Sequence, residues 1–336
     1  MASSRAFQQK PSIWSPTVRT KHSWWTTIKR YRYIYLMMLP AVVWFFLFRW
    51  MTIYGMLVAF KQFFALKGIL NSPFVGWTNF QNVLHNPDLP WLIRNALIIN
   101  FYRLLFALPA PVILALLINE IKSKVFKRSV QTLTYLPHFI TWVVIGGIVY
   151  GLLQYNYGFV NHMLISTGRQ PIAWYQSPQY WRAFLVGAGI WKEIGWGTIL
   201  YLAIIATNAN PEIYEAAIVD GATRFQQIRH LSLPVMLPMV GFNVVFMVAG
   251  VFGSDVGELF ALVGGNARLF QTVDTIDYFL FRAVAPVAGT GGVGGAADFG
   301  YGFLTALGIL QAMVGVALFI AGNWAAKKFF RWSGMF

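Results

Sequence analysis

Residues 208–234 read NANPEIYEAAIVDGATRFQQIRHLSLP and lie between two long apolar stretches. Asn210 is a favourable N-cap, Pro211 suits the first position of a helix, and Glu212 complements the positive end of a helix dipole. Gly221 is placed to end this helix, because glycine adopts a left-handed backbone at low cost. The first half of the segment therefore predicts a short, well-capped helix rather than a flexible loop.

The second half of the segment predicts another short helix, from about Thr223 to Leu231. Pro234 is then expected to start the apolar stretch that follows. Two helices joined at Gly221 form a helix–glycine–helix elbow. Because two rigid rods at a fixed angle transmit a push, and a flexible loop of the same length does not, the elbow is the first candidate for a functional element.

The chain around the elbow is 57% hydrophobic and only 11% charged over its 336 residues. Soluble domains are nearer 45–50% apolar, with about a quarter of their residues charged. Most apolar segments approach the ~20 residues that cross a hydrocarbon core, although the first and third are short. We therefore predict an all-α polytopic membrane protein with six transmembrane helices. The expected spans are residues 33–48, 95–118, 139–154, 181–206, 235–252 and 301–326.

Lysine and arginine residues mark one side of the membrane. They gather in the N-terminal tail, around 122–128, in the elbow and near 327–331, whereas the loops on the other side carry fewer cations. The basic side is expected to be cytoplasmic, which places the elbow and both termini inside the cell. The expected divisions are a basic cytoplasmic tail (1–32), a first span with its external loop (33–91), a core of five spans with the elbow at about 208–234 (92–328), and a cytoplasmic C-terminus (329–336).

Several kinds of chemistry are excluded by what the sequence lacks. There is no cysteine, so disulfides and thiolate metal sites cannot form, and the five histidines show no metal-ligand spacing. No Gly-x-x-x-x-Gly-Lys-Ser/Thr run occurs, so the chain is not expected to split ATP. The net charge of +15 lies mostly beside the apolar segments, which indicates membrane topology rather than nucleic-acid binding. We expect no enzyme activity, no metal and no cofactor in this chain.

Two glycine patterns are assigned structural roles. Gly147 and Gly151 form a small-xxx-small pair that predicts close helix packing on their face. The glycine-rich stretch 289–295 contains a match to the dinucleotide-binding pattern, but no strand precedes it, so it is interpreted as a flexible loop.

The elbow resembles the EAA loop of ABC importer permeases, because Glu215, Ala216, Ala217 and Gly221 stand at the spacing of that motif. The resemblance implies a type I importer fold in which the elbow docks into a cleft on a separate ATPase. Glu215 would face the ATPase as a charged contact. Ala216 and Ala217 would allow close helix packing, and Gly221 would make the turn.

The resemblance continues past the elbow. Leu231 and Pro234 would seat its second helix against the bundle, although Leu231 stands where isoleucine is more usual in the family. Further stretches are similar to permeases of the oligo- and polysaccharide branch of carbohydrate importers. These stretches are residues 54–61, 73–80, 135–142 and 190–197.

What the resemblance implies about partners is specific. The importer would sit in a bacterial inner membrane as a multi-pass protein in a lipid bilayer. It would contain a second permease subunit, making a heterodimer, and two ATP-binding subunits that hold ATP and Mg. An external or periplasmic solute-binding protein would deliver the saccharide.

Polar and aromatic residues near or within the expected spans are candidates for the sugar pathway. Charges at membrane depth usually face the bundle interior or a watery cavity, and an aromatic face can support a pyranose ring. Structural pairing and ordinary packing are the alternatives. The loop acids Asp255 and Glu258 could bind sugar hydroxyls, but loop acids are more often solvated, and we expect these two to be solvated. An acidic polysaccharide would favour Arg268, Arg282 and Lys192 as contacts. The candidates are Trp142, Trp191, Lys192, Glu193, Trp196 and Arg282.

Two other functions remain open from the residues. An ion-coupled secondary transporter usually carries intramembrane carboxylates or inverted repeats, and Glu193 is the clear acid deep in an expected span. A membrane enzyme or assembly scaffold for polysaccharide would need a set of facing catalytic groups, and no such set is visible in the sequence.

Overall fold

The computed structural model describes residues 28–208, 210–285 and 296–329. Most of the expected basic tail, the glycine-rich stretch 289–295 and nearly all of the expected C-terminal segment lie outside these residues. The chain divides into two compact units, Met1–Gly55 and Met56–Phe336, so residues 56–91 group with the later helices.

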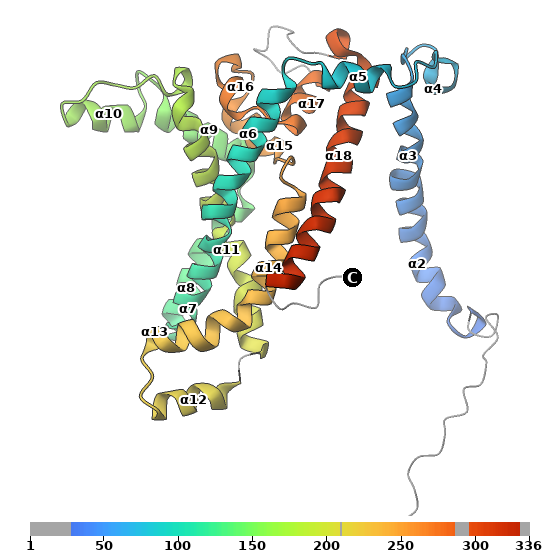
Figure 1. Ribbon diagram of the computed structural model, residues 1–336. Helices are drawn as coiled ribbons and strands as arrows, with labels where there is room; N and C mark the ends of the chain where they lie inside the picture. Colours follow the sequence, from blue (N-terminus) through green and yellow to red (C-terminus); the bar gives the residue numbers. More distant parts are fainter. Residues whose placement is uncertain (1–27, 209, 286–295, 330–336) are drawn as a thin grey trace, which may run out of the picture. The chain divides into compact units, whose positions relative to one another are not determined.

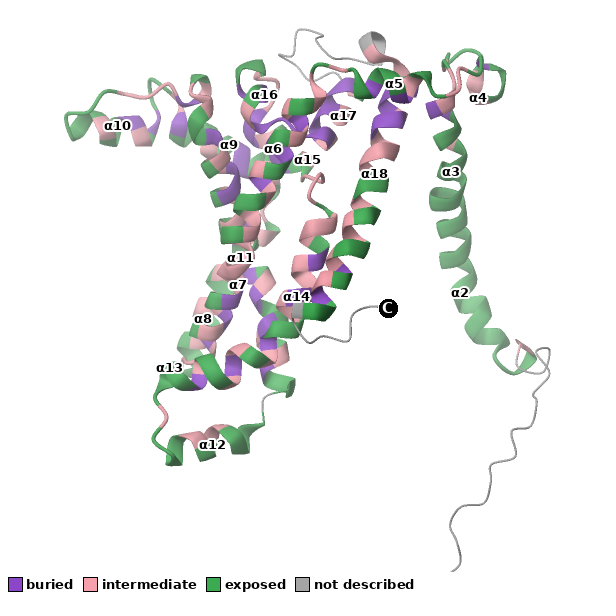
Figure 2. Cartoon of the chain, viewed as in Figure 1, coloured by how far each residue is buried: buried purple, intermediate pink, exposed green. Residues whose placement is uncertain are grey.

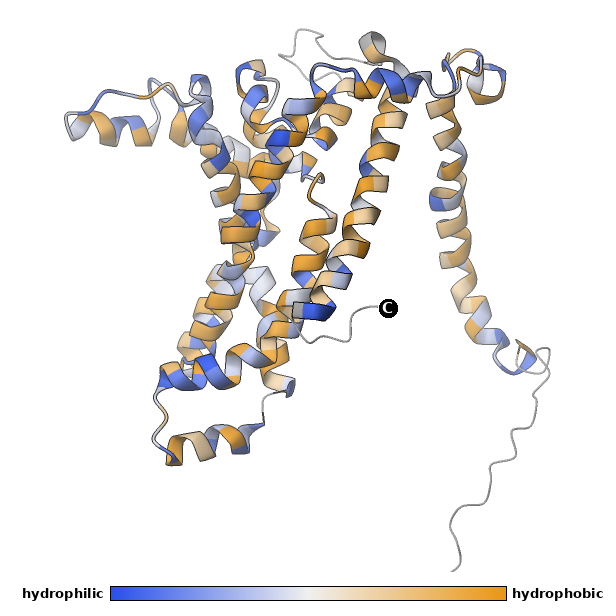
Figure 3. Ribbon diagram, in the orientation of Figure 1, coloured by the Kyte–Doolittle hydropathy of each residue, from blue (hydrophilic) through white to orange (hydrophobic). Residues whose placement is uncertain are grey.

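The first unit contributes one apolar rod, made of α2 (Arg32–Phe45), the π-helical turn η1 (Phe46–Trp50) and α3 (Met51–Gly55). Apart from Arg32 and Arg49 its residues are uncharged, and nearly all of its side chains are exposed (Figures 2 and 3). A helix that is apolar on every side matches lipid as its surroundings.

The second unit is helical throughout its described part, apart from loops and one isolated antiparallel bridge between Lys61 and Phe74 (Figure 1). Its α-helices are α4 (Gly68–Asn71), α5 (Thr78–Leu84), α6 (Leu89–Tyr102), α7 (Pro109–Asn119), α8 (Lys124–Tyr135), α9 (Trp142–Leu153), α10 (Phe159–Ser166), α11 (Trp181–Asn208), α12 (Pro211–Val219), α13 (Arg224–Gln227), α14 (Leu233–Ala249), α15 (Val256–Val263), α16 (Ala267–Val273), α17 (Ile276–Val284) and α18 (Ala296–Phe329). Its 3₁₀-helices are η2 (Met56–Phe60), η4 (Leu136–Phe139), η5 (Trp174–Gln176) and η6 (Pro178–Tyr180), and its π-helices are η3 (Arg103–Ala107) and η7 (Ile228–Ser232).

Four helices in the described part of the chain are long and apolar enough to cross a membrane, or five if one bent pair counts as a single span. They coincide with four of the six expected spans, and α18 is interrupted at Gly300, just before the expected start at residue 301. The all-helical prediction is confirmed, whereas the count of six spans stays a prediction. The four helices are Arg32–Phe60, Leu89–Asn119, Arg224–Ala249 and Phe299–Lys328.

The other two expected spans differ from a simple apolar helix, each for a visible reason. Residues 139–154 form only the short α9, which meets the preceding helix Lys124–Phe139 at a bend of 95°. Pro137 lies at this bend, where its missing N–H favours a break. In α11 the length is sufficient at 28 residues, but Lys192 and Glu193 near its middle lower its apolar character.

Close backbone contacts hold the long helices of the second unit together. α11 packs along α7, α14 along α18, and α15 along α9. A Cβ atom on Gly195 would lie 2.0 Å from the carbonyl oxygen of Thr134, so only glycine fits where α11 meets α8. On α9 the close contact is made by Gly146, where a Cβ would lie 2.3 Å from the carbonyl oxygen of Ala261. The expected packing through Gly147 and Gly151 is wrong within this chain, because both face open space.

The described part of the second unit has three clusters of buried hydrophobic side chains. One joins η2, α5, α17 and α18 around Phe279 and Ala306, and a second joins α9, α11, α15 and α16 around Trp181 and Leu259. The third lies nearer the elbow, around Tyr201 on α11, with neighbours from α7 and α14. Buried hydrophobic clusters therefore pack against both ends of α11, and the elbow begins directly beyond α11.

Candidate functional site

The elbow forms at residues 210–234, and its first helix is capped as the sequence predicts. The Asn210 side-chain oxygen accepts a hydrogen bond from the backbone N–H of Glu212 at 3.0 Å, and α12 begins at Pro211. At its other end, the Gly221 N–H donates to the Ile218 carbonyl and the Ala222 N–H donates to the Ala217 carbonyl. This pair of bonds is a Schellman motif, and it requires the left-handed backbone that Gly221 has at φ +77°.

The second helix of the elbow starts where expected but does not end near Leu231. Thr223 and Gln226 form a reciprocal capping box at its start. The helix then continues through the π-helical turn η7 into α14, so the expected break before Pro234 is wrong. Within a regular helix the Pro234 ring would clash with the carbonyl four residues earlier, and the wider π turn just before it relieves that clash. The second helix of the elbow is therefore continuous with α14.

Side-chain contacts hold the elbow together, and one of them reaches outside it. The hydroxyl groups of Tyr214 and Ser232 lie 2.9 Å apart and connect α12 to η7. Arg224 lies 3.3 Å from the Glu120 carboxylate, which follows α7. Gln227, buried behind the turn, donates to the Ala222 carbonyl at 2.9 Å. Two of these contacts thus stiffen the elbow from within, and the Arg224–Glu120 contact joins it to the residue after α7.

Several apolar side chains of α12 are uncovered. Ile213 and Ile218 are more than half exposed, and Val219 is 86% exposed. Glu215 and Ala216 are also exposed on this helix, whereas Ala217 is half-buried. Because apolar residues do not normally face water together on a short rigid helix, α12 is suited to contact another protein.

Four of the candidate pathway residues meet beside the bend between α8 and α9. The Lys192 ammonium donates to the carbonyl oxygens of His138 at 2.5 Å and of Ile140 at 2.8 Å. Glu193 lies 2.8 Å from Nδ1 of His138, and the Trp196 ring stacks on the His138 ring with centroids 4.4 Å apart. Lys192 therefore satisfies backbone carbonyls that the bend leaves free, while Glu193 and Trp196 stay about half exposed beside it.

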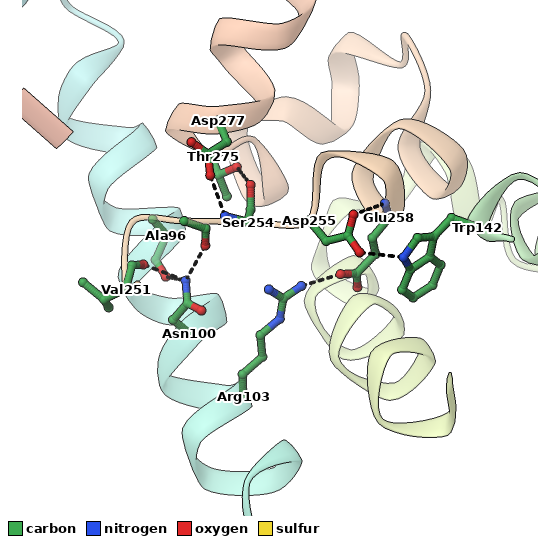
Figure 4. Close-up of polar contacts among 11 residues, drawn as sticks. Ala96, Asn100, Arg103, Trp142, Val251, Ser254, Asp255, Glu258, Thr275 and Asp277 are labelled. Atoms are coloured by element: carbon green, nitrogen blue, oxygen red, sulfur yellow. Dashed lines mark hydrogen bonds and ion pairs between the residues drawn. The ribbon is translucent and has the colours of Figure 1, made fainter. Parts of the chain in front are cut away.

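Trp142, the fourth of these residues, connects the bend to the N-terminal end of α15 (Val256–Val263). Its indole N–H donates to Asp255 at 2.6 Å, and its ring lies 5.6 Å from the Lys192 ammonium. Asp255 also accepts from the backbone N–H of Glu258 and so caps α15. Figure 4 shows this cap beside the Trp142 ring.

Glu258 is buried rather than solvated, so the expectation for this acid is wrong. It is 2% exposed, and its carboxylate lies 2.5 Å from the Arg103 guanidinium on η3 (Figure 4). The reason is that capping by Asp255 starts α15 at once, and α15 then packs against α9 and turns Glu258 inward. The intramembrane Arg103 is therefore one half of a buried ion pair.

Hydrogen bonds on the other side of Asp255 anchor the loop that follows α14. Asn100 on α6 donates to the carbonyl of Val251 at 2.6 Å, and the Ser254 and Thr275 hydroxyls lie 2.7 Å apart (Figure 4). The backbone N–H of Ser254 also donates to Asp277 at 2.7 Å. The loop thus fastens α6, α15 and α17 to one another next to the candidate pathway.

Two candidate residues lie apart from this group. Trp191 lines an apolar cavity of about 420 Å³ between α9, α10 and α11. Arg282 is 6% exposed and pairs with Asp274 at 2.7 Å, between the rings of Phe270 and Phe279. Burial raises the pKa of Asp274 to about 6, and the Arg282 charge acts in the opposite direction.

Sequence reasoning missed the residue at the centre of this site. His138 joins Glu193, Trp196 and, through its carbonyl, Lys192. Its position directly after Pro137, in the break before an apolar helix, was the available signal. No group of three or more potential metal ligands occurs among the residues that the structure describes.

This fold, with its apolar spans and its rigid elbow between α11 and α14, defines a polytopic membrane permease. Residues 107–330 match the family described as binding-protein-dependent transport system inner membrane component, and the chain belongs to that family. It is 33% identical to protein LplB of Bacillus subtilis (strain 168), over 91% of this chain and 92% of that protein. It is 31% identical to the polygalacturonan/rhamnogalacturonan transport system permease protein YteP of the same organism, over 89% of this chain and 88% of that protein.

Solved structures agree with this assignment. One chain of a bacterial ABC transporter involved in the import of the acidic polysaccharide alginate superposes with a TM-score of 0.79 at 32% identity, covering 91% of this chain and 98% of that chain. A chain of a bacterial alginate ABC transporter, in complex with a periplasmic protein that holds an alginate pentasaccharide, also gives 0.79 at 31% identity, covering 93% and 99%.

Proposed function

We propose that this chain is one permease subunit of an ATP-driven importer in a bacterial inner membrane, with six spans and both termini in the cytoplasm. An external solute-binding protein would deliver an oligo- or polysaccharide to it. A second permease subunit would complete the pathway, and two ATPase subunits would hold ATP and Mg. The names of its relatives favour an acidic polysaccharide, with alginate as the first individual choice.

The observation that carries this proposal is a short helix, α12, that has exposed apolar side chains and is bonded to the continuous helix of η7 and α14. Ile218 and Val219 are exposed, yet the Schellman turn at Gly221 and the Tyr214–Ser232 contact give α12 a fixed position. In the proposed complex, Glu215 and Ala216 belong to the face that the ATPase covers. Ala217 and Gly221 form the turn, and Leu231 and Pro234 lie on the rod that carries its movement into α14.

In the sugar pathway we propose roles for the residues around the bend. Trp196 and Trp142 would support sugar rings, and Glu193 would accept hydrogen bonds from hydroxyl groups. Lys192 would hold the bend open as well as contribute charge. Trp191 and Arg282, which lie in an apolar cavity and a buried ion pair, would act on the pathway through packing.

The test is co-purification from the native membrane in mild detergent, with wild type beside Gly221→Pro. Proline cannot adopt the φ of +77° at this position, so the elbow would be lost while the spans remain. Wild type is expected to bring down a Walker-motif ATPase and a second polytopic permease, and the variant is expected to lose the ATPase. If wild type purifies alone, or if the variant keeps every partner, the docking role is rejected. The hypothesis of an ion-coupled transporter would then be tested at Glu193.

A further inference from the structure

Two arginine side chains come together at the end of the second unit opposite the elbow. Arg94 on α6 donates to the carbonyl of Gln271 at 2.9 Å, and Arg182 on α11 donates through Nε to the next carbonyl, that of Thr272, at 3.1 Å. Both carbonyls lie in the last turn of α16. In Figure 1, α16 lies at the end of this unit opposite α12.

A buried amide holds this arrangement in place. Asn95 is fully buried, and its amide nitrogen donates to the carbonyl oxygens of Phe270, Gln271 and Asp274 at 3.1–3.2 Å. Its side-chain oxygen accepts from Nη2 of Arg182 at 3.0 Å. The position of the Arg182 guanidinium is therefore built into the fold rather than left to a mobile surface side chain.

The charges of this pair are not neutralised within the described residues. No carboxylate there forms an ion pair with Arg94 or Arg182, whereas the nearby cation Arg282 has Asp274 as its partner. The end of a helix supplies at most about half a negative charge, against two full positive charges. A guanidinium has five N–H donors. Arg182 uses its Nε donor and one Nη2 donor in these contacts, and Arg94 uses one, so both retain free donors.

A cavity opens directly beside Arg182. It has a volume of about 430 Å³ and lies between α6, η3 and α11. Gln179 and Tyr102 supply polar groups to its wall, and the ring of Phe106 and the apolar side of α11 supply the rest. This volume is in the range of small-ligand sites, and the mixture of a few polar groups with aromatic and apolar surface is typical of them.

We propose that Arg94 and Arg182 form an entry site for the carboxylate groups of an acidic saccharide. The guanidinium forks match the two oxygens of a carboxylate, and Arg182 lines a cavity that offers an amide and aromatic rings to a sugar ring. The site lies at the end of α11 farthest from the elbow, which is the external mouth if the elbow is cytoplasmic. The inference rests on the proposed saccharide import for its ligand and adds the residues that select for charge.

This assignment differs from the cationic contacts expected from the sequence. Arg282 and Lys192 already bind Asp274 and backbone carbonyls, respectively. Arg94 and Arg182 form no ion pair among the described residues, and Arg182 lines a cavity.

The test measures saccharide binding and requires neither uptake nor ATP hydrolysis. It therefore gives a result even if the transport proposal fails. The assembled permease complex is placed in phosphatidylcholine nanodiscs, and saturation-transfer NMR compares trigalacturonate with its carboxyl-reduced counterpart. Wild type is expected to bind trigalacturonate about tenfold or more tightly than the neutral sugar, in keeping with a charged hydrogen bond of about 1.5–3 kcal/mol. Arg94→Gln, at the exposed position, and the double variant with Arg182→Gln should lose this preference.

Two further arms distinguish an acidic saccharide from a lipid headgroup and from a general effect of surface charge. Arg169→Gln removes an exposed charge elsewhere, outside this pair, and should leave the preference intact. Discs containing phosphatidylglycerol should not abolish binding. The proposal would be overturned if wild type bound the two sugars equally, or if Arg94→Gln kept the preference. It would also be overturned if phosphatidylglycerol displaced the sugar, and that result would assign the pair to a lipid headgroup. If the double variant does not assemble, Arg94→Gln and Arg182→Lys give the same comparison.

Discussion

The ammonium group of Lys192 on α11 lies 2.5 Å from the carbonyl oxygen of His138. His138 lies at the 95° bend between the helix Lys124–Phe139 and α9. The same ammonium group also reaches the carbonyl of Ile140. A bend in a membrane protein frees backbone carbonyls that lipid cannot satisfy, so a partner from the protein is required. Lys192 is that partner, which explains a buried cation near the middle of α11.

Lys192→Met should therefore destabilise the protein. Leaving one buried acceptor unsatisfied costs about 1–3 kcal/mol, and two carbonyls lose their donor here. The expected result is a lower melting temperature of the purified complex in detergent. Lys124→Met, at an exposed position at the start of α8, is the matched control and should melt with wild type. Equal melting of both variants would show that the bend is held by other groups.

Gly221 should tolerate asparagine but not valine. Its φ of +77° lies in the left-handed region, and a Cβ there would meet no atom within 4 Å, so the backbone conformation alone limits the substitution. Asparagine visits this region readily, whereas a β-branched residue is strained there. Gly221→Asn should retain the co-purifying ATPase and Gly221→Val should lose most of it. Loss with both variants would mean that size, and not conformation, matters at this turn.

A charge introduced at an exposed apolar position of α12 should weaken ATPase binding more than a charge at other exposed apolar positions. Val219→Asp places a carboxylate at an 86% exposed position, so the fold should survive while a docked partner would have to bury that charge. The measurement is the amount of ATPase recovered per permease, with a fall of at least tenfold expected from a penalty of about 1.4 kcal/mol or more. Val125→Asp, on α8 at 76% exposure, is the matched control. A similar fall in both would indicate general damage rather than docking through α12.

The Arg103–Glu258 pair should show strong coupling in a double-mutant cycle. Glu258 is 3% exposed in its side chain, so removing Arg103 alone leaves a buried charge and costs about 3–5 kcal/mol. Arg103→Met and Glu258→Met should each destabilise the protein, and the double variant should be more stable than the sum of the two losses predicts. Unfolding followed by tryptophan fluorescence gives the four free energies. Additive losses would mean that the two charges do not depend on each other.

Gly195→Ala should disturb the contact between α11 and α8. The added methyl group would lie 2.0 Å from the Thr134 carbonyl, and overpacking of this kind costs about 1–3 kcal/mol or more. The expected result is a broader size-exclusion peak and a lower melting temperature. Gly147→Ala, in open space on α9, should instead be neutral or slightly stabilising, because alanine favours a helix. Comparable behaviour of the two variants would contradict the close approach at Gly195.

Features that depend on neighbouring residues could be predicted from the sequence alone. Asn210 and Gly221 begin and end α12 through hydrogen bonds within a few residues of themselves, so capping rules were enough to predict the elbow. Long apolar runs predicted six spans, and four of these coincide with helices long and apolar enough to cross a membrane, since hydropathy is a local property. The resemblance in the elbow also placed the chain in the family that residues 107–330 match.

Which distant groups meet was settled by the packing of the helices. Glu258 is buried because α15 packs against α9, and its partner Arg103 stands 155 positions earlier in the chain, so no local pattern separates Glu258 from a solvated loop acid. Gly146, and not Gly147, contacts α15 because the orientation of α9 is set by the helices around it. Likewise, Arg94 and Arg182 form a pair only because α6 and α11 both reach the last turn of α16. Charge pairing and helix orientation depend on packing between residues far apart in the chain. A single sequence does not show which distant residues pack together.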